Sequence, residues 1–147
     1  MKRPALVVDT NVVIAGLLSS AKDSPVALIL DAMLDGHILY LLSPALLAEY
    51  RRVLIRPKLA KLHKLSESEI DELLTTLVAN AVWRDPSAFT EAPDPGDRHL
   101  WALLASQPNS ILVTGDQLLL DNPPDNASVI SPRACIDRLL SKRGAER

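Results

Sequence analysis

Short apolar runs alternate along this chain with longer stretches of helical periodicity, and that alternation limits the possible folds more than any other feature. The runs are Ala5–Val8, Ile38–Leu42, Ala81–Trp83, Ile111–Val113 and Ser128–Ile130. Parallel strands need a crossover between them, usually a helix, and strands covered on both faces read as continuous apolar runs. The sequence therefore predicts an α/β fold with a five-stranded parallel sheet and helices on both of its faces.

Capping residues mark where the intervening helices begin. Ser24 and Ser43 each precede a proline, which places a capping hydroxyl before a proline at the first helical position. Ser66 and Glu69 have the spacing of a capping box. Another helix is predicted over Pro95–Ala105, after a loop that is rich in proline. The helices are thus as well defined in the sequence as the strands.

Composition restricts the class of protein. A length of 147 residues with no internal linker indicates a single domain over residues 1–147. The only cysteine, Cys135, lies in an apolar pattern and is expected to be a buried thiol, which excludes a disulfide framework within the chain and fits the cytoplasm. No segment approaches the roughly 20 apolar residues of a membrane span, so we expect no membrane contact.

A carboxylate stands between two apolar runs near the start of the chain. Asp9 follows Ala5–Val8 directly, and the apolar pattern resumes at Val12. Burying an unpaired charge there costs several kcal/mol, and the only nearby cations, Lys2 and Arg3, lie on the wrong side of the strand. A bound metal ion would offset that cost; the simpler alternative is an acid that caps the following helix.

Other acids fall where they could share such an ion. Asp116 follows the strand 111–113, Asp97 lies in the first turn of the helix before that strand, and Glu49 lies at the edge of the apolar stripe of the helix 44–54. Ligands of open parallel sheets bind at the carboxyl ends of the strands. Two charges 4 Å apart repel by about 4 kcal/mol at an effective dielectric constant of about 20. A site of carboxylates without histidine or thiolate favours Mg²⁺ or Mn²⁺.

Each of these acids also has a purely structural explanation. Asp97 could be a favourable charge in a helix's first turn, Asp116 could cap the segment that follows it, and Glu49 could pair with Arg52 on a helix surface. Asp94, followed by proline, is better interpreted as an N-cap than as a ligand.

Two polar residues could orient the carboxylates. Thr114 and Asn11 each lie close in sequence to a predicted ligand and could hold it by a hydrogen bond. Formation of a turn explains Asn11 equally well.

The segment 51–64 carries only basic charges. Because net charge is −2, any affinity for nucleic acid must come from such a local patch. The run could be a solvated helix face or a contact surface for an RNA strand, and the sequence favours neither. The candidate RNA contacts are Arg51, Arg52, Arg56 and Lys58.

The ordered acid motifs resemble those of PIN-domain nucleases, and among these the toxin components of bacterial toxin–antitoxin systems. Residues 7–18 resemble the first motif of the family, residues 43–50 the second, residues 94–97 followed by Leu100 the third, and residues 113–119 the fourth. Residues 129–133 resemble the final strand and turn of the family. The similarity therefore extends in order over nearly the whole chain.

The resemblance implies a three-layer α/β/α sandwich with the sheet order 3-2-1-4-5. It implies that Asp9, Glu49, Asp97 and Asp116 are the catalytic, metal-binding acids of a Mg²⁺-dependent ribonuclease. It further implies a homodimer that is inhibited by a cognate antitoxin protein. Alternative functions are a catalytically inert PIN-like interaction module, and a PIN nuclease that acts in RNA processing or on DNA.

Overall fold

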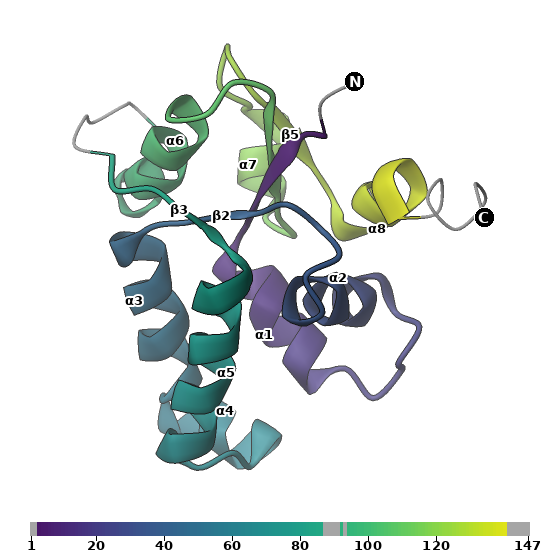
Figure 1. The fold of residues 1–147 in the computed structure, drawn as a ribbon, viewed down its shortest axis with the longest axis vertical. Helices are drawn as coiled ribbons and strands as arrows, with labels where there is room; N and C mark the ends of the chain where they lie inside the picture. The colour runs from purple at the N-terminus through teal and green to yellow at the C-terminus, as the bar shows by residue number, and fades with distance from the viewer. Residues whose placement is uncertain (1–2, 87–91, 93, 141–147) are drawn as a thin grey trace.

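The larger of two parallel sheets has the strand order β1-β4-β5 in the computed structural model, which describes residues 3–86, 92 and 94–140 (Figure 1). β1 (Ala5–Val8) pairs with β4 (Ser110–Val113), and β4 pairs with β5 (Ser128–Ile130). Val8 stands beside Val113 in this register. The segments that follow these two residues therefore leave the sheet at the same edge.

The second sheet pairs β2 (Leu41–Leu42) with β3 (Val82–Trp83), also in parallel. Among the described residues, one isolated parallel bridge, between Leu6 and Tyr40, connects it to β1. The prediction of one five-stranded sheet in the order 3-2-1-4-5 is therefore wrong, although the parallel pairings within each sheet follow that order. β2 and β3 are only two residues long, and the Leu6 N–H donates a 2.9 Å hydrogen bond to the carbonyl oxygen of Leu39, before β2 begins.

Helices connect the strands and account for most of the remaining structure. They are α1 (Thr10–Leu18), α2 (Pro25–Leu34), α3 (Pro44–Leu54), α4 (Pro57–His63), α5 (Glu67–Asn80), the 3₁₀ turn η1 (Pro95–Asp97), α6 (Arg98–Ala105), α7 (Gln117–Asp121), α8 (Pro132–Cys135) and the π-helical turn η2 (Ile136–Leu140). Ser24 and Ser43 accept capping hydrogen bonds as predicted, and Ser66 and Glu69 form a complete capping box.

The predicted helix 95–105 is divided into two parts. Asp94 Oδ1 accepts a 2.8 Å hydrogen bond from the backbone N–H of Gly96, which confirms its interpretation as an N-cap. That contact tightens the first turn into η1, and α6 begins only after Asp97. Asp97 therefore stands at a junction between two helical segments, with its side chain free of any capping bond.

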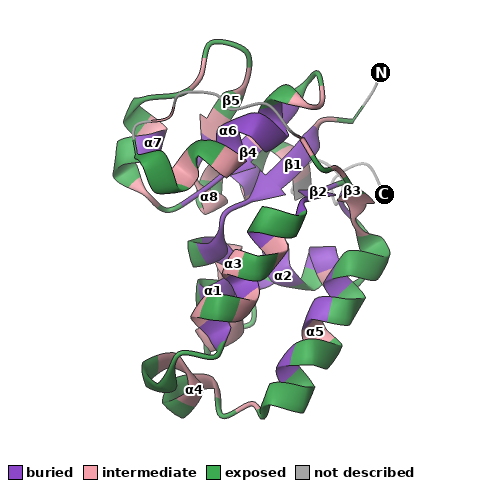
Figure 2. Cartoon of the chain, turned by 90° about the vertical axis from the view of Figure 1, so that its left-hand side faces the viewer, coloured by how far each residue is buried: buried purple, intermediate pink, exposed green. Residues whose placement is uncertain are grey.

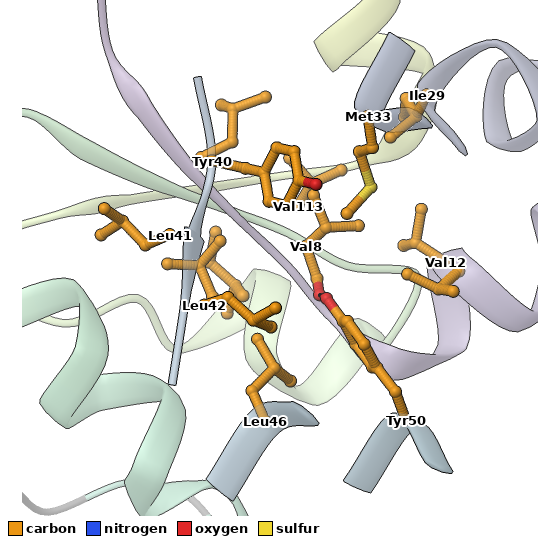
Figure 3. Close-up of a cluster of buried hydrophobic side chains, with 14 of the residues drawn as sticks. Val8, Val12, Ile29, Met33, Tyr40, Leu41, Leu42, Leu46, Tyr50 and Val113 are labelled. Atoms are coloured by element: carbon orange, nitrogen blue, oxygen red, sulfur yellow. Dashed lines mark hydrogen bonds between the residues drawn. The ribbon is translucent and has the colours of Figure 1, made fainter. Parts of the chain in front are cut away.

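The core lies between the sheets and helices α1, α2, α3, α5 and α6, and Figure 3 shows the part next to α1, α2 and α3. Tyr50 is fully buried on α3, and its hydroxyl donates a hydrogen bond to the carbonyl oxygen of Val8 at the end of β1. Gly16 allows α1 to approach α2 closely, because a Cβ at this position would lie 2.6 Å from the carbonyl oxygen of Val26. Cys135 is buried, as its apolar surroundings predict. These contacts fix the helices that frame the end of β1.

Helices α3, α4 and α5 extend away from the strands (Figure 1). No residue of α4 is buried, and α5 presents an exposed outer face (Figure 2). Of the helices within the described ranges, none combines the length and apolar character that a membrane crossing requires.

Candidate functional site

A pocket of about 480 Å³ opens where β1 and β4 end. All four acids predicted as metal ligands line it, although they come from separate segments of the chain: Asp9, Glu49, Asp97 and Asp116. Thr10 and Asn11 complete its polar wall, and apolar side chains of α1 and α3 form the remainder. The structure thus brings together the acids that the sequence motifs single out.

Asp9 lies deepest among these acids and is held from several directions. The residue follows the last residue of β1, and it is only 5% exposed. Oδ1 accepts a 2.8 Å hydrogen bond from the backbone N–H of Thr10, as the N-cap of α1. Oδ2 accepts hydrogen bonds of 2.8 Å from Thr114 Oγ1 and 3.2 Å from Asn11 Nδ2. Asp9 is therefore both the cap that the simpler interpretation predicts and a wall of the pocket.

Asn11 and Thr114 connect the ends of β1 and β4, as side chains that orient a carboxylate would. Asn11 Nδ2 lies 3.3 Å from Thr114 Oγ1, and its Oδ1 accepts a 3.1 Å hydrogen bond from the backbone N–H of Gly115. Thr114 Oγ1 also accepts a 3.0 Å bond from the backbone N–H of Asp116. The turn after β4 is thereby fixed against the start of α1.

Asp116 and Asp97 are less buried than Asp9. Asp116 caps α7 through a 3.0 Å bond from the backbone N–H of Leu118 to its Oδ1. Asp97 is half-buried at the junction of η1 and α6. Burial raises the pKa of Asp97 to about 6, and the negative charges of Asp9, Asp94, Asp116 and Glu49 add to the rise.

Glu49 differs from the other acids because both of its carboxylate oxygens have side-chain partners. Oε1 accepts a 2.7 Å hydrogen bond from Thr10 Oγ1, and Oε2 lies 2.7 Å from Nε2 of His99. The bond from His99 is the main reason that the pKa of Glu49 is lowered, while burial acts in the opposite direction. By contrast, burial raises the pKa of Asp9 despite its hydrogen bonds to Thr114 and Thr10.

Sequence reasoning missed Thr10 and His99. The three histidines do not have the spacing of metal ligands in the sequence. His99 reaches the site through its contact with Glu49, which lies 50 positions earlier in the chain. Helical periodicity does not reveal His99, because it follows Asp97 by two positions and residues with that spacing do not share a helix face.

The donor set fits a hard divalent cation in its chemistry. It consists of carboxylates, and the pKa values of Asp9 and Asp97 are raised, so both groups would gain from a nearby positive charge. Within residues 3–86, 92 and 94–140, however, no three Asp, Glu, His or Cys side chains form a group that could hold a metal ion as they stand. The acids share a pocket, and their role as metal ligands stays a prediction.

The two arginines that follow Tyr50 have different surroundings. Arg51 forms ion pairs with Glu67 and Asp71 on α5, with N–O distances of 2.9 and 3.0 Å. This arrangement favours the solvated-face interpretation for Arg51. Arg52 lies close enough to Glu49 for its charge to lower the pKa of that acid.

Comparison with known proteins identifies the fold. A family model described as a PIN domain matches residues 5–118, a range that contains all four acids. The structure of the T. brucei RRP44 PIN domain is similar with a TM-score of 0.51 and 13% sequence identity, over 98% of this chain and 85% of that chain. No curated protein sequence matches. Because the family model spans well over half of the sequence, this chain belongs to the PIN domain family.

Proposed function

We propose that this protein is a Mg²⁺- or Mn²⁺-dependent ribonuclease that hydrolyses phosphodiester bonds. The observation that carries the proposal is the meeting of four acids from distant segments in one pocket at the carboxyl ends of parallel strands. Membership of the PIN family supports it, because PIN domains are generally metal-dependent nucleases. Burying the carboxylate of Asp9 costs free energy, and a functional role for its charge would explain why it is buried.

The acids would divide the work between them. Asp9, Asp97 and Asp116 would hold the divalent ion, with Asn11 and Thr114 orienting Asp9. Such an ion, when bound, makes water a stronger nucleophile and stabilises the leaving oxygen of a phosphodiester. Glu49, fixed at the pocket edge, would help place the ion or orient the attacking water.

The substrate would enter along α1 and α3. The pocket continues from the acids over Ile14, Leu18 and Val53, which form an apolar floor. Arg52, Arg56 and Lys58 would supply positive charge for the phosphate backbone beside it. Within the described part of the chain, no ion pair involves these three residues.

A more specific role is the toxin component of a toxin–antitoxin pair. Its support is the order and content of the four motifs, which resemble that bacterial branch of the family. A cognate antitoxin and a homodimer belong to this proposal, and so does a cytoplasmic location. Expression in a bacterial host tests it: the wild type should arrest growth and the Asp9→Asn variant should not.

The decisive experiment for catalysis is incubation of the purified chain with RNA. We expect cleavage with Mg²⁺ or Mn²⁺, no cleavage with EDTA, and no cleavage by Asp9→Asn. Cleavage that survives both chelation and the substitution would overturn the proposal. Failure to bind Mn²⁺ in a calorimetric titration would favour an inert interaction module instead. A parallel panel of structured RNA and single-stranded DNA separates RNA cleavage from action on DNA.

A further inference from the structure

Three helices meet at the carboxylate of Glu49. Thr10 is the first residue of α1, Glu49 lies in the middle of α3, and His99 is the second residue of α6. Thr10 and His99 are 39 and 50 positions from Glu49 in the sequence, yet each lies 2.7 Å from a different carboxylate oxygen. Thr10 is 5% exposed, and the side chains of Glu49 and His99 are each 20% exposed. Glu49 is thus held from both sides at the edge of the pocket.

The contact with His99 uses one ring nitrogen only. A carboxylate accepts hydrogen bonds and does not donate them, so the proton of this contact belongs to Nε2 of His99. Nδ1 is buried and has no hydrogen-bond partner within the described residues. The interaction therefore needs a donor at the position of Nε2 and nothing else from the imidazole ring.

Glu49 consequently differs from the acids around it. Both of its carboxylate oxygens have a side-chain partner, whereas Oδ1 of Asp9 accepts its bond from a backbone N–H. A carboxylate with two oxygens has about four lone-pair positions, so two bonds leave it able to accept further contacts. The side chains of Thr10 and His99 thus orient Glu49 and leave lone pairs for further contacts.

We infer that Thr10 and His99 are positioning residues, which hold the carboxylate of Glu49 in the single orientation from which it contributes to the metal-binding pocket. This inference rests on the proposed metal-dependent function. It assigns roles to two residues that stand one and two positions after the motif acids Asp9 and Asp97. It also makes Glu49 an anchored group rather than a freely rotating one. Partners that orient a metal-binding group in this way typically contribute 10- to 100-fold to affinity or activity.

Replacement of His99 tests the inference with a matched series in the full chain. Gln carries an amide nitrogen as far from Cβ as Nε2 of His99, whereas the amide of Asn reaches only as far as Nδ1. In calorimetric titrations with Mn²⁺, we expect His99→Ala and His99→Asn to lower the affinity by about 10-fold or more. We expect His99→Gln to recover most of the loss.

Replacement of Thr10 gives an independent second series. Thr10→Val removes the hydroxyl and keeps the shape, and Thr10→Ser keeps the hydroxyl. Because Thr10 holds Asp9 through its backbone N–H, neither change removes that contact. We expect Thr10→Val to lower Mn²⁺ affinity by about 10-fold and Thr10→Ser to restore it.

Nuclease kinetics provide the second readout. Loss of orientation should reduce kcat and leave KM for RNA nearly unchanged, because neither side chain is proposed to contact the substrate. The inference is overturned if His99→Ala binds Mn²⁺ like the wild type, or if His99→Gln is as impaired as His99→Ala. Should the wild type bind Mn²⁺ without cleaving RNA, the proposed function fails while the affinity series still decides the positioning roles. A wild type that binds no Mn²⁺ contradicts both.

Discussion

Thr114 Oγ1 lies 2.8 Å from Oδ2 of Asp9, a hydrogen bond that joins the end of β4 to the end of β1 across 105 positions of sequence. The parallel pairing of β1 with β4 brings the two residues to the same edge of the sheet. A second bond, from the backbone N–H of Thr10, holds the other carboxylate oxygen. The position of Asp9 is therefore set by the fold itself.

Substitution of Asp9 by Asn should separate activity from folding. The amide oxygen can still accept the bond from the backbone N–H of Thr10, and the substitution removes a buried charge whose pKa burial raises. We expect RNA cleavage to fall by roughly 100-fold or more. Removing a residue that only orients a metal ligand typically costs 10- to 100-fold, and Asp9 is proposed to be a ligand itself. Circular dichroism should show an unchanged spectrum, and a variant that fails to fold would contradict this expectation.

The stability of the metal-free protein should depend on pH through Asp97. Its pKa rises from 3.8 to about 6 on folding, so the folded state binds more protons than the unfolded state between these values. The contribution of Asp97 is therefore fully present below pH 3.8 and is lost as the pH rises through about 6. In urea unfolding at several pH values, the free energy of unfolding should fall less with rising pH for Asp97→Asn than for the wild type. Equal pH profiles would contradict the prediction.

Divalent cations should stabilise the folded chain. A ligand that binds only the folded state at 100 times its Kd adds about 2.7 kcal/mol to the free energy of unfolding. Mn²⁺ should accordingly raise the Tm of the wild type, and EDTA should reverse the shift. Asp97→Asn should show a much smaller shift, because it removes a carboxylate from the pocket. An equal shift in this variant would place the ion elsewhere.

Gly16→Ala should destabilise the packing of α1 on α2. The new Cβ would lie 2.6 Å from the carbonyl oxygen of Val26, a backbone atom that moves only if α2 moves. Overpacking of this kind typically costs 1–3 kcal/mol in the free energy of unfolding. Gly115→Ala is the matched control, since its Cβ would meet Asn11 Oδ1 at an ordinary 3.6 Å. Urea denaturation compares the two variants, and equal losses would contradict the packing argument.

Two adjacent arginines should differ in their effect on RNA binding. Arg51 is engaged by Glu67 and Asp71, whereas the charge of Arg52 acts on Glu49 at the pocket. We expect Arg52→Ala to weaken RNA binding and to reduce the dependence of log affinity on log salt concentration by about 1. Arg51→Ala should change both quantities less. Fluorescence anisotropy with labelled RNA over a salt series measures them, and a larger effect at Arg51 would contradict this assignment.

The sequence predicted the positions of the strands and the acids because each depends on local pattern. Apolar runs and capping serines are read from neighbouring residues, and both are confirmed in the structure. Asp9 was conspicuous because it interrupts such a run. The length of a ladder depends on the partner strand as well, which is why the division into two sheets was not predicted.

Contacts between helices were the least predictable part of the site. Nothing in the local sequence of His99 indicates that α6 turns it towards α3, and Thr10 stands beside an acid that attracts more attention. The 3₁₀ turn at residues 95–97 depends on the side chain of Asp94 folding back to Gly96, a detail that helical periodicity does not contain. Tertiary geometry decides the first two features, and a local side-chain contact decides the third.

The acid pocket draws its residues from segments attached to both sheets. Asp9 and Asp116 follow strands of the larger sheet, and Glu49 belongs to the helix that follows β2 of the smaller one. Within the described residues, the backbone pairing between the two sheets is the bridge of Leu6 with Tyr40. The bonds of Glu49 to Thr10 and His99, like the bond from Tyr50 to the carbonyl oxygen of Val8, therefore connect the helix after the smaller sheet to segments next to the larger one.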